Sequence, residues 1–119
     1  MFFVVFKDRR KQHRWHLKAG NGRIIAKSAQ PHDTEGKAID AAIDAANDRM
    51  TSYANFDFYK DKKGEWRWRC VQFSNGKGAD KILADSAESY TRKANAQRMV
   101  TKVANALAIA SGAVDIRSE

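Results

Sequence analysis

Short runs of alternating apolar and polar residues occur twice along the chain and predict two similar sets of β-strands. Residues 2–7 and 56–60 are rich in aromatic and β-branched residues, and residues 13–18 and 66–71 alternate with the period of a half-buried strand. A charged segment that begins at Asp8 or Asp61 separates the two runs of each set. Such turn residues predict two β-hairpins.

A turn, a short third strand and a helix follow each predicted hairpin. The turns are indicated by Asn21-Gly22 and Asn75-Gly76. The first helix is expected to begin at Asp33 or Thr34, because either side chain can accept a hydrogen bond from the first turn. Its apolar stripe is Ala38, Ile39, Ala42, Ile43 and Ala46. The second helix is expected over residues 90–110, with Ser111-Gly112 as its end and with a stripe of Ala96, Met99, Val100, Val103 and Leu107.

The two sets align with each other as an internal repeat. A shift of 53 positions superimposes Phe3 on Phe56, Asp8 on Asp61 and Trp15 on Trp68, and also Lys7 on Lys60 and Arg14 on Arg67. A shift of 58 positions aligns the third strands, at 24–28 and 82–86. The predicted fold is therefore α+β, with two βββα repeats in a single domain of residues 1–119. Repeat one covers 1–50, repeat two covers 55–110, and 111–119 form a C-terminal tail.

The second repeat resembles a known family. The motif consists of Phe58-Tyr-Lys-Asp-x-x-Gly-Glu-Trp-Arg-Trp-Arg69, Asn75-Gly76, Ile82-Leu-Ala-Asp-Ser86 and Glu88-Ser-Tyr-Thr-Arg-Lys-Ala94. This is similar to the repeat of the YegP-like family of uncharacterised small proteins. The first repeat follows the pattern less closely and has Lys11 where the family usually has Gly. The resemblance implies a pseudo-two-fold antiparallel sheet packed against helices, and it implies no activity.

Charge and composition restrict the class of partner. Twenty-two Lys and Arg against fourteen Asp and Glu give a net charge of +8 and a pI near 9.8, which favours contact with polyanions. No apolar run approaches the roughly 20 residues that span a bilayer, and the first six residues lack the features of a secretion signal. The single Cys70 excludes an internal disulfide framework. We expect a cytoplasmic protein without membrane contact.

The residue types that catalysis or metal binding requires are not grouped in this sequence. We find no nucleophile with a nearby base and no pair of carboxylates at a recognisable spacing. His13 and His16 would point to opposite faces of one strand, so they cannot share a metal ion without a bulge. Cys70 shares parity with the Trp residues and is expected to be buried. We therefore predict no enzymatic activity, no metal and no cofactor.

Strand alternation assigns the two faces of the predicted sheet. Because burying Trp15 and Trp68 is far cheaper than burying unpaired cations, the Trp face should be the core and the opposite face should be open. Residues placed on the open face by parity are Arg14, His16, Lys18, Arg67, Arg69 and Val71, together with Val4, Phe6, Asp57 and Tyr59 of the first strands.

This open face suggests two kinds of binding. Rings among cations on a sheet are typical of proteins that bind single-stranded nucleic acid. The predicted site comprises Phe6, Arg14, His16, Lys18, Tyr59, Arg67 and Arg69, with the turn cations Arg9, Arg10, Lys11, Lys62 and Lys63. The alternative is contact with an acidic or other protein, or a homodimer formed through exposed Val4 and Phe6.

Overall fold

The first half of the chain forms three strands and a helix. The computed structural model describes residues 1–73, 80–110 and 113–119; the predicted turn at Asn75-Gly76 and helix end at Ser111-Gly112 lie outside them. The strands are β1 (Phe2–Lys7), β2 (His13–Lys18) and β3 (Ile24–Ser28). Helix α1 (Glu35–Asp44) begins after Thr34, whose Oγ1 accepts a hydrogen bond from the Lys37 amide. The expected N-cap is confirmed.

The second half follows the same order of elements. Its strands are β4 (Phe56–Lys60), β5 (Trp66–Gln72) and β6 (Lys81–Ser86), and its helix is α2 (Lys93–Ala110). A π-helical turn (Ala45–Arg49) and a 3-10 turn (Tyr53–Asn55) connect the halves. The expectation that α2 begins at Tyr90 was wrong, because Tyr90 and Trp66 exchange two backbone hydrogen bonds as a β-bridge.

In the part of the chain that the structure describes, seven strands form one mixed sheet in the order β4-β5-β6-β3-β2-β1-β7. At its centre β3 and β6 pair antiparallel, with Lys27 opposite Asp85. The last strand, β7 (Ile116–Ser118), pairs parallel to β1. This corrects the expected purely antiparallel sheet. The end of the tail is ordered because it supplies hydrogen-bond partners for the edge of β1, which would otherwise be exposed.

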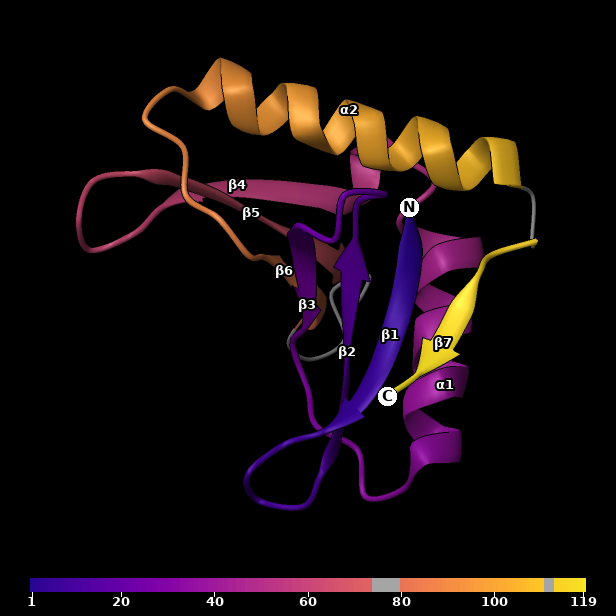
Figure 1. Cartoon of the computed structure of the whole chain (residues 1–119). Coiled ribbons are helices and arrows are strands. Elements are labelled where there is room, and N and C mark those ends of the chain that lie inside the picture. Colours follow the sequence, from indigo (N-terminus) through magenta and orange to yellow (C-terminus); the bar gives the residue numbers. More distant parts are fainter. Residues whose placement is uncertain (74–79, 111–112) are drawn as a thin grey trace.

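Both helices cover one face of the sheet, α1 over β1 and β2 and α2 over β4 and β5 (Figure 1). Trp15 and Trp68 are 1% and 0% exposed in the core between them. Each indole meets a phenylalanine ring edge-on, with Phe3–Trp15 and Phe56–Trp68 centroids 5.2 and 5.5 Å apart. The predicted core face is confirmed.

Two residues expected on the open face are buried. Val4 is 6% exposed, because β2 and β7 flank it on both sides, where it pairs with His16 and Arg117. Val71 is 4% exposed, because the β5–β6 register shifts between Cys70 and Val71. Such a bulge breaks the alternation on which the expectation rested.

Candidate nucleic-acid interface

The face of the sheet turned away from both helices carries polar side chains from β2 to β6 and the apolar side chain of Phe6 from β1. In the β1–β2 hairpin, Phe6 lies directly opposite Arg14, and in the β4–β5 hairpin, Tyr59 lies directly opposite Arg67. These four residues are half-buried rather than fully exposed. Each hairpin therefore places one ring beside one arginine, as the sequence predicted.

Asp8 fixes both the first turn and Arg14. Its Oδ1 accepts hydrogen bonds from the Arg10 and Gln12 amides at 2.9 and 3.0 Å. Its Oδ2 accepts one from Arg14 Nε at 2.9 Å. The Gln12 amide and the Arg14 guanidinium lower the pKa of Asp8, so it is ionised at neutral pH.

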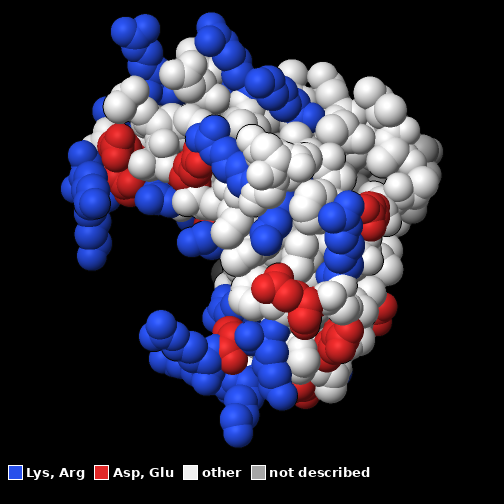
Figure 2. Space-filling view, in the orientation of Figure 1, with Lys and Arg blue, Asp and Glu red and all other residues white. Residues whose placement is uncertain are grey.

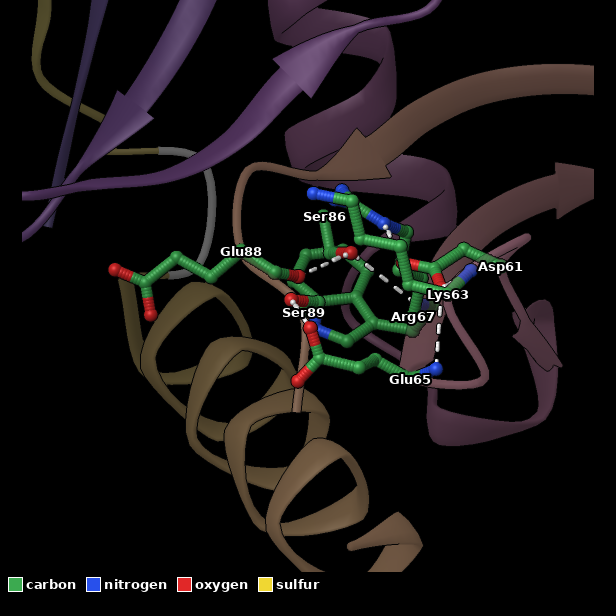
Figure 3. Close-up of polar contacts among 8 residues, drawn as sticks. Asp61, Lys63, Glu65, Arg67, Ser86, Glu88 and Ser89 are labelled. Atoms are coloured by element: carbon green, nitrogen blue, oxygen red, sulfur yellow. Dashed lines mark hydrogen bonds and ion pairs between the residues drawn. The ribbon is translucent and has the colours of Figure 1, made fainter. Parts of the chain in front are cut away.

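Asp61 makes the same three contacts in the second turn. Its Oδ1 accepts hydrogen bonds from the Lys63 and Glu65 amides at 2.9 and 3.0 Å, and its Oδ2 accepts one from Arg67 Nε at 2.9 Å (Figure 3). The Arg67 guanidinium and then the Glu65 amide lower the pKa of Asp61. The turn role expected for both aspartates is confirmed, and each has a second role as the partner of an arginine.

Arg69 is engaged more completely than Arg14 or Arg67. Its Nε and Nη2 both donate to Asp57 Oδ2, at 3.2 and 3.0 Å, and its guanidinium lies 4.8 Å from the centroid of the Tyr59 ring. Asp85 lies opposite Arg69 on one side and Lys27 on the other. Burial raises the pKa of Asp85, while the cations of Arg69, Arg67 and Lys27 oppose that effect.

His16 and Lys18 were predicted as part of a cationic site. Burial lowers the pKa of His16, and the nearby Lys27 and Lys18 lower it further, so the ring is neutral at pH 7. Its ring lies 4.4 Å from that of Phe6. Lys27 of β3 lies directly opposite His16 and is exposed, and Lys18 follows His16 by two residues on β2 and is half-buried. His16 therefore contributes a ring that packs at a tilt against Phe6 rather than a charge.

The predicted turn cations lie at the two ends of the open face. Arg9, Arg10, Lys11, Lys62 and Lys63 are all exposed. Figure 2 shows a hollow on the side away from the helices, with Lys and Arg side chains projecting on both sides of it and acidic groups among them. The open face thus has a rim of cations at each end. At equivalent positions of the two turns, Lys11 and Gly64 both have left-handed backbones, with φ of 63° and 79°.

Sequence reasoning placed Asp57 on this face but missed its other acidic members. Asp8 and Asp61 were assigned to turns alone, and Asp85 and Lys27 were not assigned to a face. The recurring spacing of six residues in Asp8–Arg14 and Asp61–Arg67 was the signal that could have identified the ion pairs.

The described residues hold no group of three or more His, Cys, Asp or Glu arranged to bind a metal. Cys70 is fully buried, and burial raises the pKa of its thiol to about 12. No helix within the described ranges is both long and apolar enough to span a bilayer.

A second surface lies on the outer side of α2. It is an open groove of about 670 Å³ whose lining residues are Tyr53, Ala94, Gln97, Arg98, Thr101 and Lys102. Arg98 lies on α2, which covers the opposite face of the sheet, and therefore provides a reference cation away from the open face.

Comparison with known proteins gives a family match over one segment of the chain and a shared fold, but no activity. The family described as Domain of unknown function (DUF1508) matches residues 8–47, and no curated protein matches the chain. The solution structure of the protein of unknown function YegP from E. coli is similar with a TM-score of 0.74 and 18% identity, covering 99% of this chain and 91% of that one. A UPF0339 protein from Shewanella oneidensis is similar with a TM-score of 0.70 and 18% identity, covering 98% and 89%.

The family match and the structural matches agree with the resemblance found in the sequence. The matched segment, residues 8–47, lies in the first half of the chain, whereas the motif was recognised in the second half. Both matched structures cover nearly the whole chain and share its fold. This chain therefore shares the fold of YegP, and its residues 8–47 match the DUF1508 family model.

Proposed function

We propose that this protein is a non-enzymatic, cytoplasmic binding module that holds nucleic acid on the open face of its sheet and uses no cofactor. The observation that carries the proposal is the placement of charge. The two hairpins, residues 2–18 and 56–72, contain eleven Lys and Arg but only four Asp and Glu, which accounts for +7 of the net charge of +8. Their turns flank the hollow of Figure 2. A concave face bordered by cations concentrates polyanions near it.

The rings support single-stranded rather than duplex nucleic acid. Phe6 and Tyr59 lie beside Arg14 and Arg67 on the open face, so a ring and a cation are adjacent in each hairpin. Unpaired bases stack on such rings while their phosphates contact the cations.

We further propose that the chain consists of two βββα repeats related by a pseudo-two-fold axis. At the centre of the sheet, Ala26 pairs with Ser86, Lys27 with Asp85 and Ser28 with Ala84, which is symmetric under the shift of 58 positions. Trp15 N donates to Ser28 Oγ and Trp68 N to Ser86 Oγ, at 3.1 and 3.3 Å. These matched contacts are what two copies of one unit would produce.

A protein partner is the second proposal, and the mixed charge of the face favours it. Asp57, Asp61 and Asp85 lie among the cations of the second hairpin, and alternating signs suit a protein surface better than a uniform polyanion. For a homodimer through Val4 and Phe6, only Phe6 remains accessible, because Val4 is buried.

The test is the salt dependence of binding to single-stranded DNA and RNA. About four to six phosphate contacts give a slope of log affinity against log salt of about 3 to 4 in magnitude. Replacing Arg14, Arg67 and Arg69 by Gln should flatten the slope by about 2, whereas Tyr59→Ala should weaken binding by about 1 to 3 kcal/mol at unchanged slope.

Arg98→Gln is the matched control, since it removes one cation from α2. If Arg98→Gln weakens binding as much as the loss of each sheet arginine does, the attraction comes only from diffuse net charge. If single-stranded DNA, single-stranded RNA and duplex all fail to bind at low salt, a protein partner becomes the better proposal.

A further inference from the structure

Two arginines of the open face are held differently from the other ion-paired arginines. Within the described ranges, Arg23, Arg69 and Arg117 each donate to a carboxylate through both Nε and Nη2. Arg14 and Arg67 donate through Nε alone, each at 2.9 Å. The outer edge of these two guanidinium groups, with Nη1 and Nη2, therefore has no partner among the described residues.

Each of these arginines is held in place by a carboxylate that cannot easily turn. Asp8 and Asp61 each use one oxygen for two backbone amides of their turn and the other for the arginine. The side chains of Arg14 and Arg67 are 36% and 34% exposed. Each guanidinium thus has a fixed inner edge and a free outer edge, and less side-chain entropy is lost when the outer edge binds a ligand.

The free edge matches a specific chemistry. The two Nη groups of an arginine donate parallel hydrogen bonds to two oxygens of one phosphate. The ring opposite each arginine, Phe6 or Tyr59, lies where a base next to that phosphate can contact it.

We propose that the outer edges of Arg14 and Arg67 form two equivalent phosphate sites, one on each hairpin, and that one phosphodiester strand occupies both. This inference rests on the proposed function, and it specifies which atoms bind and that binding is bivalent. A strand that occupies both weak sites at once binds far more tightly than a ligand that occupies one site alone.

Asp8→Asn and Asp61→Asn distinguish these sites from diffuse attraction. The Asn Oδ1 still accepts the two turn amides, but its Nδ2 cannot accept the Arg Nε proton. Each substitution raises the net positive charge by one, so diffuse attraction predicts tighter binding. The phosphate sites predict weaker binding, by about three- to tenfold for each substitution, because the arginine loses its orientation.

Glu88→Gln is the matched control, since it raises the net charge equally but releases Arg23, which is not part of either site. Binding of a fluorescent single-stranded oligonucleotide of about 12 nucleotides, at one fixed salt concentration, should be unchanged or tighter for this variant. Arg14→Lys and Arg67→Lys keep the charge and the turn but remove the paired donors, and both should weaken binding. Circular dichroism verifies that each variant is folded.

Inorganic phosphate separates this inference from the proposed function. NMR of the arginine Nε–H groups should show phosphate-dependent shifts at Arg14 and Arg67, reduced in the Asn variants, and none at Arg23 or Arg117. Phosphate shifts without oligonucleotide binding would refute the proposed function and leave the two sites standing. Oligonucleotide binding that is as tight in Asp8→Asn and Asp61→Asn as in Glu88→Gln would overturn the sites and leave the proposed function intact.

Discussion

The two hairpin turns predict opposite effects of substitution at equivalent positions. Lys11 and Gly64 both have left-handed backbones, with φ of 63° and 79°. A residue with a side chain in this conformation costs about 1 to 2 kcal/mol relative to its preferred region. Glycine avoids that cost but loses about 0.4 to 1 kcal/mol more backbone entropy on folding. The net preference for glycine at either turn is therefore about 0.5 to 1 kcal/mol.

Lys11→Gly should accordingly raise the free energy of unfolding by about 0.5 to 1 kcal/mol, and Gly64→Ala should lower it by a similar amount. A Cβ added at Gly64 would meet nothing within 4 Å, so the cost at that turn is conformational and involves no clash. Lys11 is exposed and its side chain makes no hydrogen bond or ion pair in the described structure. Replacing Lys11 by glycine therefore removes little other stabilisation.

Urea unfolding followed by tryptophan fluorescence measures both changes as shifts of the midpoint at constant slope. Gly36→Ala is the control, because Gly36 lies in the first turn of α1 with a helical backbone and open space around it. That variant should be stabilised by about 0.5 to 1 kcal/mol. A destabilised Lys11→Gly, or a Gly64→Ala variant as stable as the parent, would refute the reasoning about these turns.

Three further predictions concern the core, the tail and acid stability. Trp15→Ala and Trp68→Ala should each lower the free energy of unfolding by about 3 to 5 kcal/mol; a loss below about 1 kcal/mol at either site would contradict the core assignment. Deletion of 115–119 should expose the β1 edge and cause self-association in light scattering, and a strictly monomeric deletion variant would contradict the role of β7. Because the pKa of Asp8 and of Asp61 is lowered in the folded state, their stabilisation is present above about pH 4 and is lost as pH falls through the folded-state pKa. The Asp8→Asn, Asp61→Asn double variant should therefore lose less stability than the parent on acidification, and equal losses would contradict the role of these carboxylates.

The order of elements and the core face were predictable because they depend on local pattern. Period-two alternation located the β2 and β5 strands, and Trp15 and Trp68 fixed the buried side. Side-chain chemistry alone limited the helix cap to Asp33 or Thr34, and Thr34 is the cap. Such signals lie within a few residues of the structure they specify.

The rest depends on contacts between distant segments, which alternation does not encode. Burial of Val4 requires β7, more than a hundred residues away in the chain, and burial of Val71 requires a register shift against β6. Pairing of Trp66 with Tyr90 delays the start of α2. The charge of the open face was predicted too simply, because parity placed the arginines there but did not pair Arg14 and Arg67 with Asp8 and Asp61.

The most direct test of the proposed interface is to map binding on the folded protein by NMR. At low salt, a single-stranded oligonucleotide should shift the signals of Phe6, Arg14, Tyr59 and Arg67 on the open face, and leave those of Arg98 and the α2 groove unchanged. Shifts centred on the α2 groove, or no shifts at any residue, would contradict the claim that the open face of the sheet binds nucleic acid.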